Sequence, residues 1–209
     1  MEWAFDYIQR EAEEEPDRRW HRNAKGGSVY LRLSTRPLDQ PSRTLPEALR
    51  AAIIDGGYWL RRPEPGSDLA IVYTGAVAPE AIEAAGLLSE DNRGIGVLVV
   101  TSADRLSAGW HAAQRAREQG EKVRAHVEEL LAALPRDAAV VTVTDAYPEA
   151  LSWLGGVRGH RVRALGVEHF GQSGSIAELY GHYGIDVNAI LAAVEGITGR
   201  PVRYRFAAT

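Results

Sequence analysis

Leu69-Ala-Ile-Val-Tyr73 is an unbroken apolar run, and two similar runs follow at Ile95-Gly-Val-Leu-Val-Val100 and Ala138-Ala-Val-Val-Thr-Val143. A strand with one face in solvent alternates apolar and polar side chains, whereas a continuous run is typical of a strand that is covered on both faces. Such strands occur mainly in parallel sheets, whose consecutive strands are joined by helices. The three runs therefore predict a mostly parallel sheet between two layers of helices.

The segments around these runs have helical spacing. Apolar residues recur at helical intervals in 79–88 and in 121–134. A fourth run at 162–167 precedes a glycine-rich turn and a further helix, and Asp186 is placed to cap the last helix. The alternation at 202–206 predicts an edge strand. Residues 67–209 are thus expected to form a three-layer α/β/α, Rossmann-like domain.

The first 66 residues have a different pattern. Residues 3–8 predict a short helix, and residues 28–33 alternate as a strand does when one side lies on a core. Because such a strand has no sheet of its own here, we interpret residues 1–35 as the tail end of another domain. Residues 36–66 are rich in proline and are interpreted as a linker with one short helix.

Composition excludes several classes of protein. The chain has 209 residues and a formal net charge of −4, which gives no overall attraction to nucleic acid. It has no cysteine, and no apolar run approaches the length of a membrane span. The start lacks the features of a signal peptide, so a cytoplasmic location is expected. The basic residues near 158–163 and 200–205 are interpreted as solvated strand ends.

The glycine-rich turn between the fourth run and the next helix is the strongest candidate for a functional segment. Ser175 and Glu178 match a capping box, which needs no ligand, although the turn could instead contact a partner or bind an anion. None of the six histidines has metal-site spacing, and no carboxylate lies in a recognisable acid–base motif. The candidate turn and interface residues are His169, Phe170, Gly171, Ser173, Ser175 and Glu178.

A longer stretch, Leu165-Gly-Val-Glu-His-Phe-Gly-Gln-Ser-Gly-Ser-Ile-Ala-Glu-Leu-Tyr-Gly-His-Tyr-Gly-Ile-Asp-Val-Asn-Ala-Ile190, resembles the C-terminal domain of the transketolase superfamily. Residues 28–41 look like the last strand of that superfamily's pyrimidine-binding domain and its exit into a linker. Residues 1–8 look like the last helix of the same domain. Within the superfamily, the resemblance is best to homodimeric first components of pyruvate dehydrogenase, and transketolase is next.

The resemblance implies a five-stranded sheet with one antiparallel strand, whose main role is subunit contact and support. It also implies a larger homodimeric enzyme that uses thiamine diphosphate and magnesium and can join a dehydrogenase complex. The family's Gly-Asp-Gly metal motif is absent from this chain, and the glutamate that activates the cofactor is expected before residue 1. We therefore expect a C-terminal fragment that lacks the catalytic domains, holds no cofactor and is inactive by itself.

Three functions remain in competition. The first is part of an enzyme that oxidatively decarboxylates a 2-oxo acid, and the second is part of a transketolase acting on sugar phosphates. In the second case Arg36, in Ser34-Thr-Arg36, is the candidate ligand of the sugar phosphate, although its segment is one residue longer than the family's. The third is an independent α/β module that binds a nucleotide or a protein. In such a fragment, the apolar side chains of Trp3, Phe5, Trp20 and residues 29–33 would lack their parent domain. We therefore expect the chain to self-associate.

Overall fold

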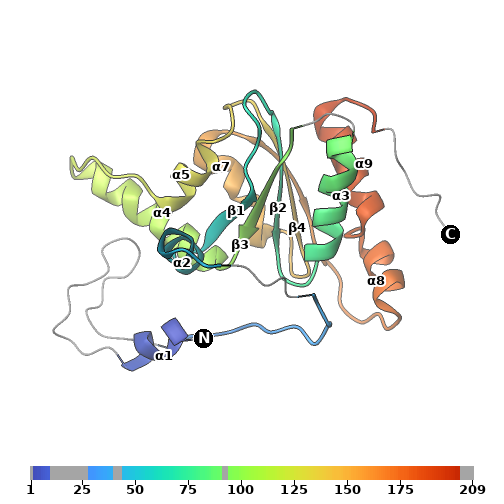
Figure 1. Ribbon diagram of the computed structural model, residues 1–209, viewed down its shortest axis with the longest axis horizontal. Helices are drawn as coiled ribbons and strands as arrows, with labels where there is room; N and C mark the ends of the chain where they lie inside the picture. Colours follow the sequence, from blue (N-terminus) through green and yellow to red (C-terminus); the bar gives the residue numbers. More distant parts are fainter. Residues whose placement is uncertain (1, 10–27, 40–43, 91–93, 203–209) are drawn as a thin grey trace.

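A five-stranded sheet forms the centre of the computed structural model, which describes residues 2–9, 28–39, 44–90 and 94–202 (Figure 1). The strands lie in the order β1-β3-β2-β4-β5, and all are parallel except β1, which is antiparallel to β3. The predicted α/β class and mostly parallel sheet are therefore confirmed. The strands are β1 (Gly57–Arg61), β2 (Leu69–Thr74), β3 (Gly96–Val100), β4 (Ala139–Thr144) and β5 (Arg161–Leu165).

The central strand β2 is covered on both faces, as its unbroken apolar run predicts. Ile71 packs on one side with α3 (Ala78–Glu90) and α9 (Val187–Thr198). Val72 packs on the other side with α4 (Ala103–Glu118) and its neighbours. Neither side chain has any exposed surface, and burying one such side chain contributes about 1.5–3 kcal/mol. The two apolar layers are thus the main source of stability.

The remaining helices described here are short, and α5 (His126–Leu131), α6 (Glu149–Ser152) and α7 (Leu154–Arg158) lie in the connections between strands. The layer of α4 also contains these three helices. The helix α8 (Ile176–Tyr183) precedes α9, whose N-terminus is capped by Asp186 as predicted, through a 2.8 Å bond from the Ala189 amide. None of the described helices is both long and apolar enough to cross a membrane.

The proline-rich composition predicts a linker that includes residues 57–61, but these residues form β1 of the same sheet. The helix α2 (Glu47–Ile54) leads into this strand through Gly56, whose φ of +110° favours glycine. Trp59 then donates from Nε1 to the Leu130 carbonyl at 3.0 Å, which attaches the edge strand to α5. The strand has only five residues and lies in a proline-rich stretch, which is why its sequence pattern did not indicate a strand.

The helix expected over 121–134 is shorter than predicted. Residues 121–125 are irregular and α5 begins only at His126, because the Glu128 carboxylate accepts a 2.8 Å bond from the Ala125 amide and caps the helix there. Val123, which the helical pattern placed inward, is exposed. A local cap therefore overrides the apolar periodicity in this segment.

The N-terminal segment contains the predicted helix, α1 (Glu2–Gln9), but no strand at 28–33. Those residues are extended without a neighbouring strand, and Leu33 is 77% exposed. A strand needs backbone partners, and none of the described strands supplies them here. Trp20 and the edge strand expected at 202–206, apart from Val202, lie outside the described residues.

Candidate functional site

The carboxyl ends of β2 and β4 form the point where the direction of the sheet reverses. The chain goes from β2 to β3 on one side and then crosses to β4 on the other, and Thr74 pairs with Thr144 at the ends of the two strands. In open α/β sheets, ligands bind in the crevice at this switch point. The residues that follow these two strands are therefore the first candidates for a functional site.

Asp145, directly after β4, lies against the turn that follows β2. Gly75 has a φ of +85°, and a Cβ added there would overlap the Asp145 carboxylate. The Ala76 amide donates to Asp145 Oδ2 at 3.4 Å. Glycine at position 75 therefore serves both the left-handed backbone and the close approach of the carboxylate.

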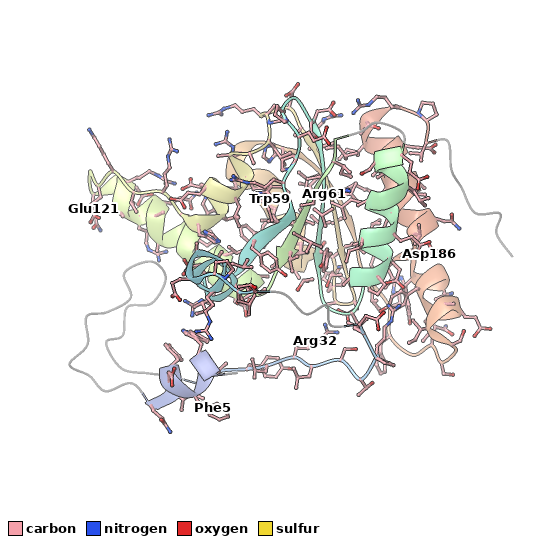
Figure 2. The ribbon with its side chains drawn as sticks, in the orientation of Figure 1. Phe5, Arg32, Trp59, Arg61, Glu121 and Asp186 are labelled. Atoms are coloured by element: carbon pink, nitrogen blue, oxygen red, sulfur yellow. The ribbon has the colours of Figure 1, made fainter. Side chains whose placement is uncertain are left out.

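Arg32, on the N-terminal extended segment, reaches the edge of the crevice from outside. Its Nη1 donates to Asp145 Oδ1 at 2.7 Å and its Nη2 donates to the Asp145 carbonyl at 3.1 Å. The hydrogen bond to Asp145 raises the pKa of Arg32 above its usual value, against a smaller opposing effect of burial. Figure 2 shows Arg32 on the segment that runs past this end of the sheet.

Arg36 makes a second and more buried attachment. It donates to both carboxylate oxygens of Glu80 at 2.8 and 2.9 Å and to the Ala76 carbonyl at 2.8 Å. Its guanidinium also lies 5.0 Å from the centre of the Tyr180 ring. The bond to Glu80 raises the pKa of Arg36, whereas burial raises the pKa of Tyr180.

Arg36, the predicted ligand of the sugar phosphate, is thus already paired with the Glu80 carboxylate. The two side chains are only 18% and 15% exposed, and the bidentate geometry is the one that guanidinium groups also use for phosphate. A phosphate would therefore compete with Glu80 for the same N–H groups. An open pocket of about 400 Å³ does lie between Arg32, Arg36 and Asp145.

The turn before α8 contains the predicted capping box. The Ser175 hydroxyl accepts from the Glu178 amide at 3.3 Å, and the Ser175 amide donates to Glu178 Oε2 at 2.8 Å. The hydroxyl and then the amide of Ser175 lower the pKa of Glu178 by hydrogen bonding. Gly171 has a φ of +113°, which favours glycine in the turn.

The other residues of this turn project from the domain. Phe170 is fully exposed, Ser173 is exposed, and His169 borders a groove beside β5. The structure does not bring them to the switch point, and their contact with a partner stays a prediction.

Sequence reasoning missed Arg32, Glu80 and Asp145. Asp145 directly follows a buried apolar run, and that position is a usable signal because strand carboxyl ends gather at one edge of a parallel sheet. Arg32 and Glu80 have no such signal, since their partners lie 113 and 44 residues away in the chain.

The described residues do not fit the cofactor that the resemblance implies. They contain no group of three or more His, Asp or Glu side chains placed to hold a metal ion. The Gly-Asp-Gly motif is also absent from the sequence. This part of the chain therefore offers no ligand set for the magnesium ion of that cofactor.

Comparison with known families and structures identifies relatives of this fold. A family described as the transketolase-like TK C-terminal domain matches residues 56–186, starting directly before β1. No curated protein sequence matches the chain significantly.

Among solved structures, the transketolase of Leishmania mexicana is 21% identical, with a TM-score of 0.50 over 72% of this chain and 19% of that protein. The transketolase of Campylobacter jejuni is 18% identical, with a TM-score of 0.46 over 70% of this chain and 19% of that protein. A split-gene transketolase, described as an inactive β4 tetramer, is 20% identical, with a TM-score of 0.49 over 69% of this chain and 43% of that protein. This chain thus spans about a fifth of the length of the first two proteins.

Proposed function

The chain belongs to the family of transketolase-like C-terminal domains, and we propose that it is the C-terminal domain of a thiamine diphosphate-dependent enzyme of the transketolase superfamily. The observation that supports this most is the family match over residues 56–186, which runs from β1 to the cap of α9. In this role the domain supports catalytic domains and subunit contacts, and the chemistry takes place elsewhere in the enzyme.

Within the superfamily we favour a transketolase over a 2-oxo acid dehydrogenase. The residue patterns resemble the first component of pyruvate dehydrogenase best, but the family that matches this chain is the transketolase-like C-terminal domain. The enzyme would then transfer two-carbon units between sugar phosphates. No residue of this chain is assigned a catalytic role.

The N-terminal segment supports a place beside another domain. Residues 28–33 alternate as a strand does, yet Leu31 and Leu33 are 48% and 77% exposed in the structure. We propose that these residues complete a sheet of the preceding, pyrimidine-binding domain, which would cover their apolar side. Arg32 and Arg36 would then hold that domain against the carboxyl ends of β2 and β4.

A second exposed apolar surface, on α1, supports a homodimer. Phe5 and Ile8 of α1 are 61% and 50% exposed, and apolar patches of this kind are usually covered by a partner. Sedimentation of the 209-residue chain should therefore give a dimer or larger species. A monomer at high concentration would contradict this part of the proposal.

The assignment of activity is tested on the whole enzyme that contains this domain. Loaded with thiamine diphosphate and magnesium, it should transfer a two-carbon unit from a ketose phosphate to an aldose phosphate. It should release no carbon dioxide from pyruvate. Decarboxylation without transfer would overturn the transketolase assignment in favour of the dehydrogenase, and the absence of both activities would contradict the superfamily role.

A further inference from the structure

A basic pocket lies at the opposite end of the sheet from Arg32 and Asp145. It has a volume of about 570 Å³ and is bordered by the end of α4, the irregular residues 121–125, α5 and α7. Figure 2 labels Glu121 at this end of α4. Five cations line the pocket: Arg117, Lys122, Arg124, Arg136 and Arg158.

One of the five cations is already neutralised and holds the pocket wall in place. Arg117 donates to both oxygens of Glu128 at 2.9 and 3.1 Å and to the Val123 carbonyl at 3.0 Å. Glu128 in turn accepts from the Ala125 amide at 2.8 Å. This single pair fixes the backbone on both sides of Arg124, so the loop is preorganised before any ligand binds.

The other four cations have no carboxylate partner within the described part of the chain. Lys122, Arg124 and Arg136 are exposed and make no ion pair there. The Nε of Arg158 is buried and donates to no partner among the described residues. Glu121 is the one unpaired carboxylate among the described residues lining the pocket, so positive charge remains in excess by three.

We propose that this basic pocket binds a small organic anion with two phosphate groups. Each phosphate group brings roughly 1.5–2 negative charges near neutral pH, so two groups match the excess positive charge. Guanidinium groups bind phosphate oxygens in pairs, and three of the four free cations are arginines. The pocket volume lies in the range of about 300–1,000 Å³ that is usual for small-molecule sites.

The geometry favours a small ligand over a macromolecule. The cations converge from three separate stretches, the loop of residues 122–124, Arg136 before β4 and Arg158 before β5, around one concave space. The chain as a whole is acidic, with a net charge of −4, so it offers no extended basic surface to a nucleic acid. This site is also independent of the proposed function, because it uses none of the residues near the switch point.

Titration calorimetry of the 209-residue chain with inorganic diphosphate at low ionic strength tests the proposal. Diphosphate should bind with a micromolar to submillimolar Kd, more tightly than monophosphate, and added salt should weaken it. The double variant Arg124→Gln/Arg136→Gln should bind at least about tenfold more weakly, because two of four phosphate-binding groups are lost. Both side chains are exposed, so the melting temperature should stay within about 2 °C of the wild type.

Arg163→Gln is the control for a lost surface arginine outside the pocket, because it removes one positive charge on β5 and borders the groove on the other face of the sheet. It should leave the diphosphate Kd within about twofold. The proposal is wrong if millimolar diphosphate does not bind, or if the control weakens binding as much as the double variant does. Tighter binding of an acidic peptide of equal charge would overturn it in favour of a protein partner. None of these results bears on the activity assays, so the two proposals fail separately.

Discussion

The two ends of the parallel sheet use arginine in opposite ways. At the carboxyl ends, Arg32 and Arg36 are each paired with a carboxylate, Arg32 with Asp145 and Arg36 with Glu80. At the amino ends, four cations around the basic pocket face one carboxylate. A switch point is where α/β sheets commonly bind ligands, yet here the chain's own segment occupies it. Fold alone therefore does not say which end of this sheet is available for binding.

The largest effect should come from closing the space beside Asp145. Gly75→Ala forces a Cβ into the Asp145 carboxylate at a φ of +85°, and we expect a loss of about 2–3 kcal/mol in unfolding free energy. Denaturant titration measures this change.

Gly66→Ala is the matched control for that substitution. Gly66 has a φ of +86°, but nothing lies within 4 Å of its added Cβ, so only the backbone cost of about 1 kcal/mol should remain. If both variants lose the same unfolding free energy, the close contact between residue 75 and the Asp145 carboxylate does not limit stability.

Removing the partly buried ion pair between Arg36 and Glu80 should have the next largest effect. Arg36→Ala leaves Glu80, only 15% exposed, without its partner, and should cost about 1–2 kcal/mol. Glu80→Gln combined with Arg36→Ala should cost less than the sum of the two single losses, which a double-mutant cycle measures.

In the whole enzyme, the single variant Arg36→Ala distinguishes two roles of Arg36, attachment of the N-terminal segment and binding of a sugar phosphate. Attachment of the N-terminal segment predicts a lower melting temperature and an unchanged KM. A raised KM for the phosphorylated sugar, at equal stability, would instead support phosphate binding by Arg36.

A smaller, pH-dependent effect is expected at the amino ends of the strands. His160, directly before β5, is 5% exposed, and burial lowers its pKa below 6.5, against a smaller raising effect of the Pro135 backbone carbonyl. The unfolded chain therefore takes up the proton first. This contribution to stability is complete above about pH 6.5 and is lost as the pH falls towards the folded-state pKa.

Unfolding free energies measured between pH 7.5 and 5 test this dependence. His160→Gln should flatten the fall in stability at low pH, whereas His111→Gln, at an exposed position on α4, should leave it unchanged. An unchanged slope in the His160 variant would contradict the expectation.

The smallest effect is expected from an exposed ion pair at the same end. Arg200 donates to Asp68 at 2.7 Å, but the two side chains are 48% and 46% exposed. Arg200→Gln should change stability by less than about 0.5 kcal/mol, because solvent and salt screen such pairs. A loss as large as that of Arg36→Ala would show that burial does not explain the contrast between the two pairs.

Short-range patterns in the chain predicted the layers correctly. The three apolar runs became β2, β3 and β4, and Ser175–Glu178 and Asp186 cap the helices that they were expected to cap. Each of these features depends on residues within a few positions of one another, so periodicity and caps are sufficient signals.

Longer-range features were missed or mistaken. β1 pairs with β3, some forty residues later in the chain, and residues 28–33 have the pattern of a strand but no neighbour to pair with. The basic pocket likewise combines the end of α4 with residues before β4 and β5, and no local pattern connects them.

The amino-acid sequence by itself determined that this chain forms a mostly parallel α/β domain. A strand that is buried on both faces needs apolar side chains at consecutive positions, and that pattern is visible in the sequence. Only the tertiary structure decided that Arg32 meets Asp145, 113 residues away, and that Arg36 pairs with Glu80. The strand order brings those residues together, and the strand order depends on contacts between distant segments that no single stretch of the chain encodes.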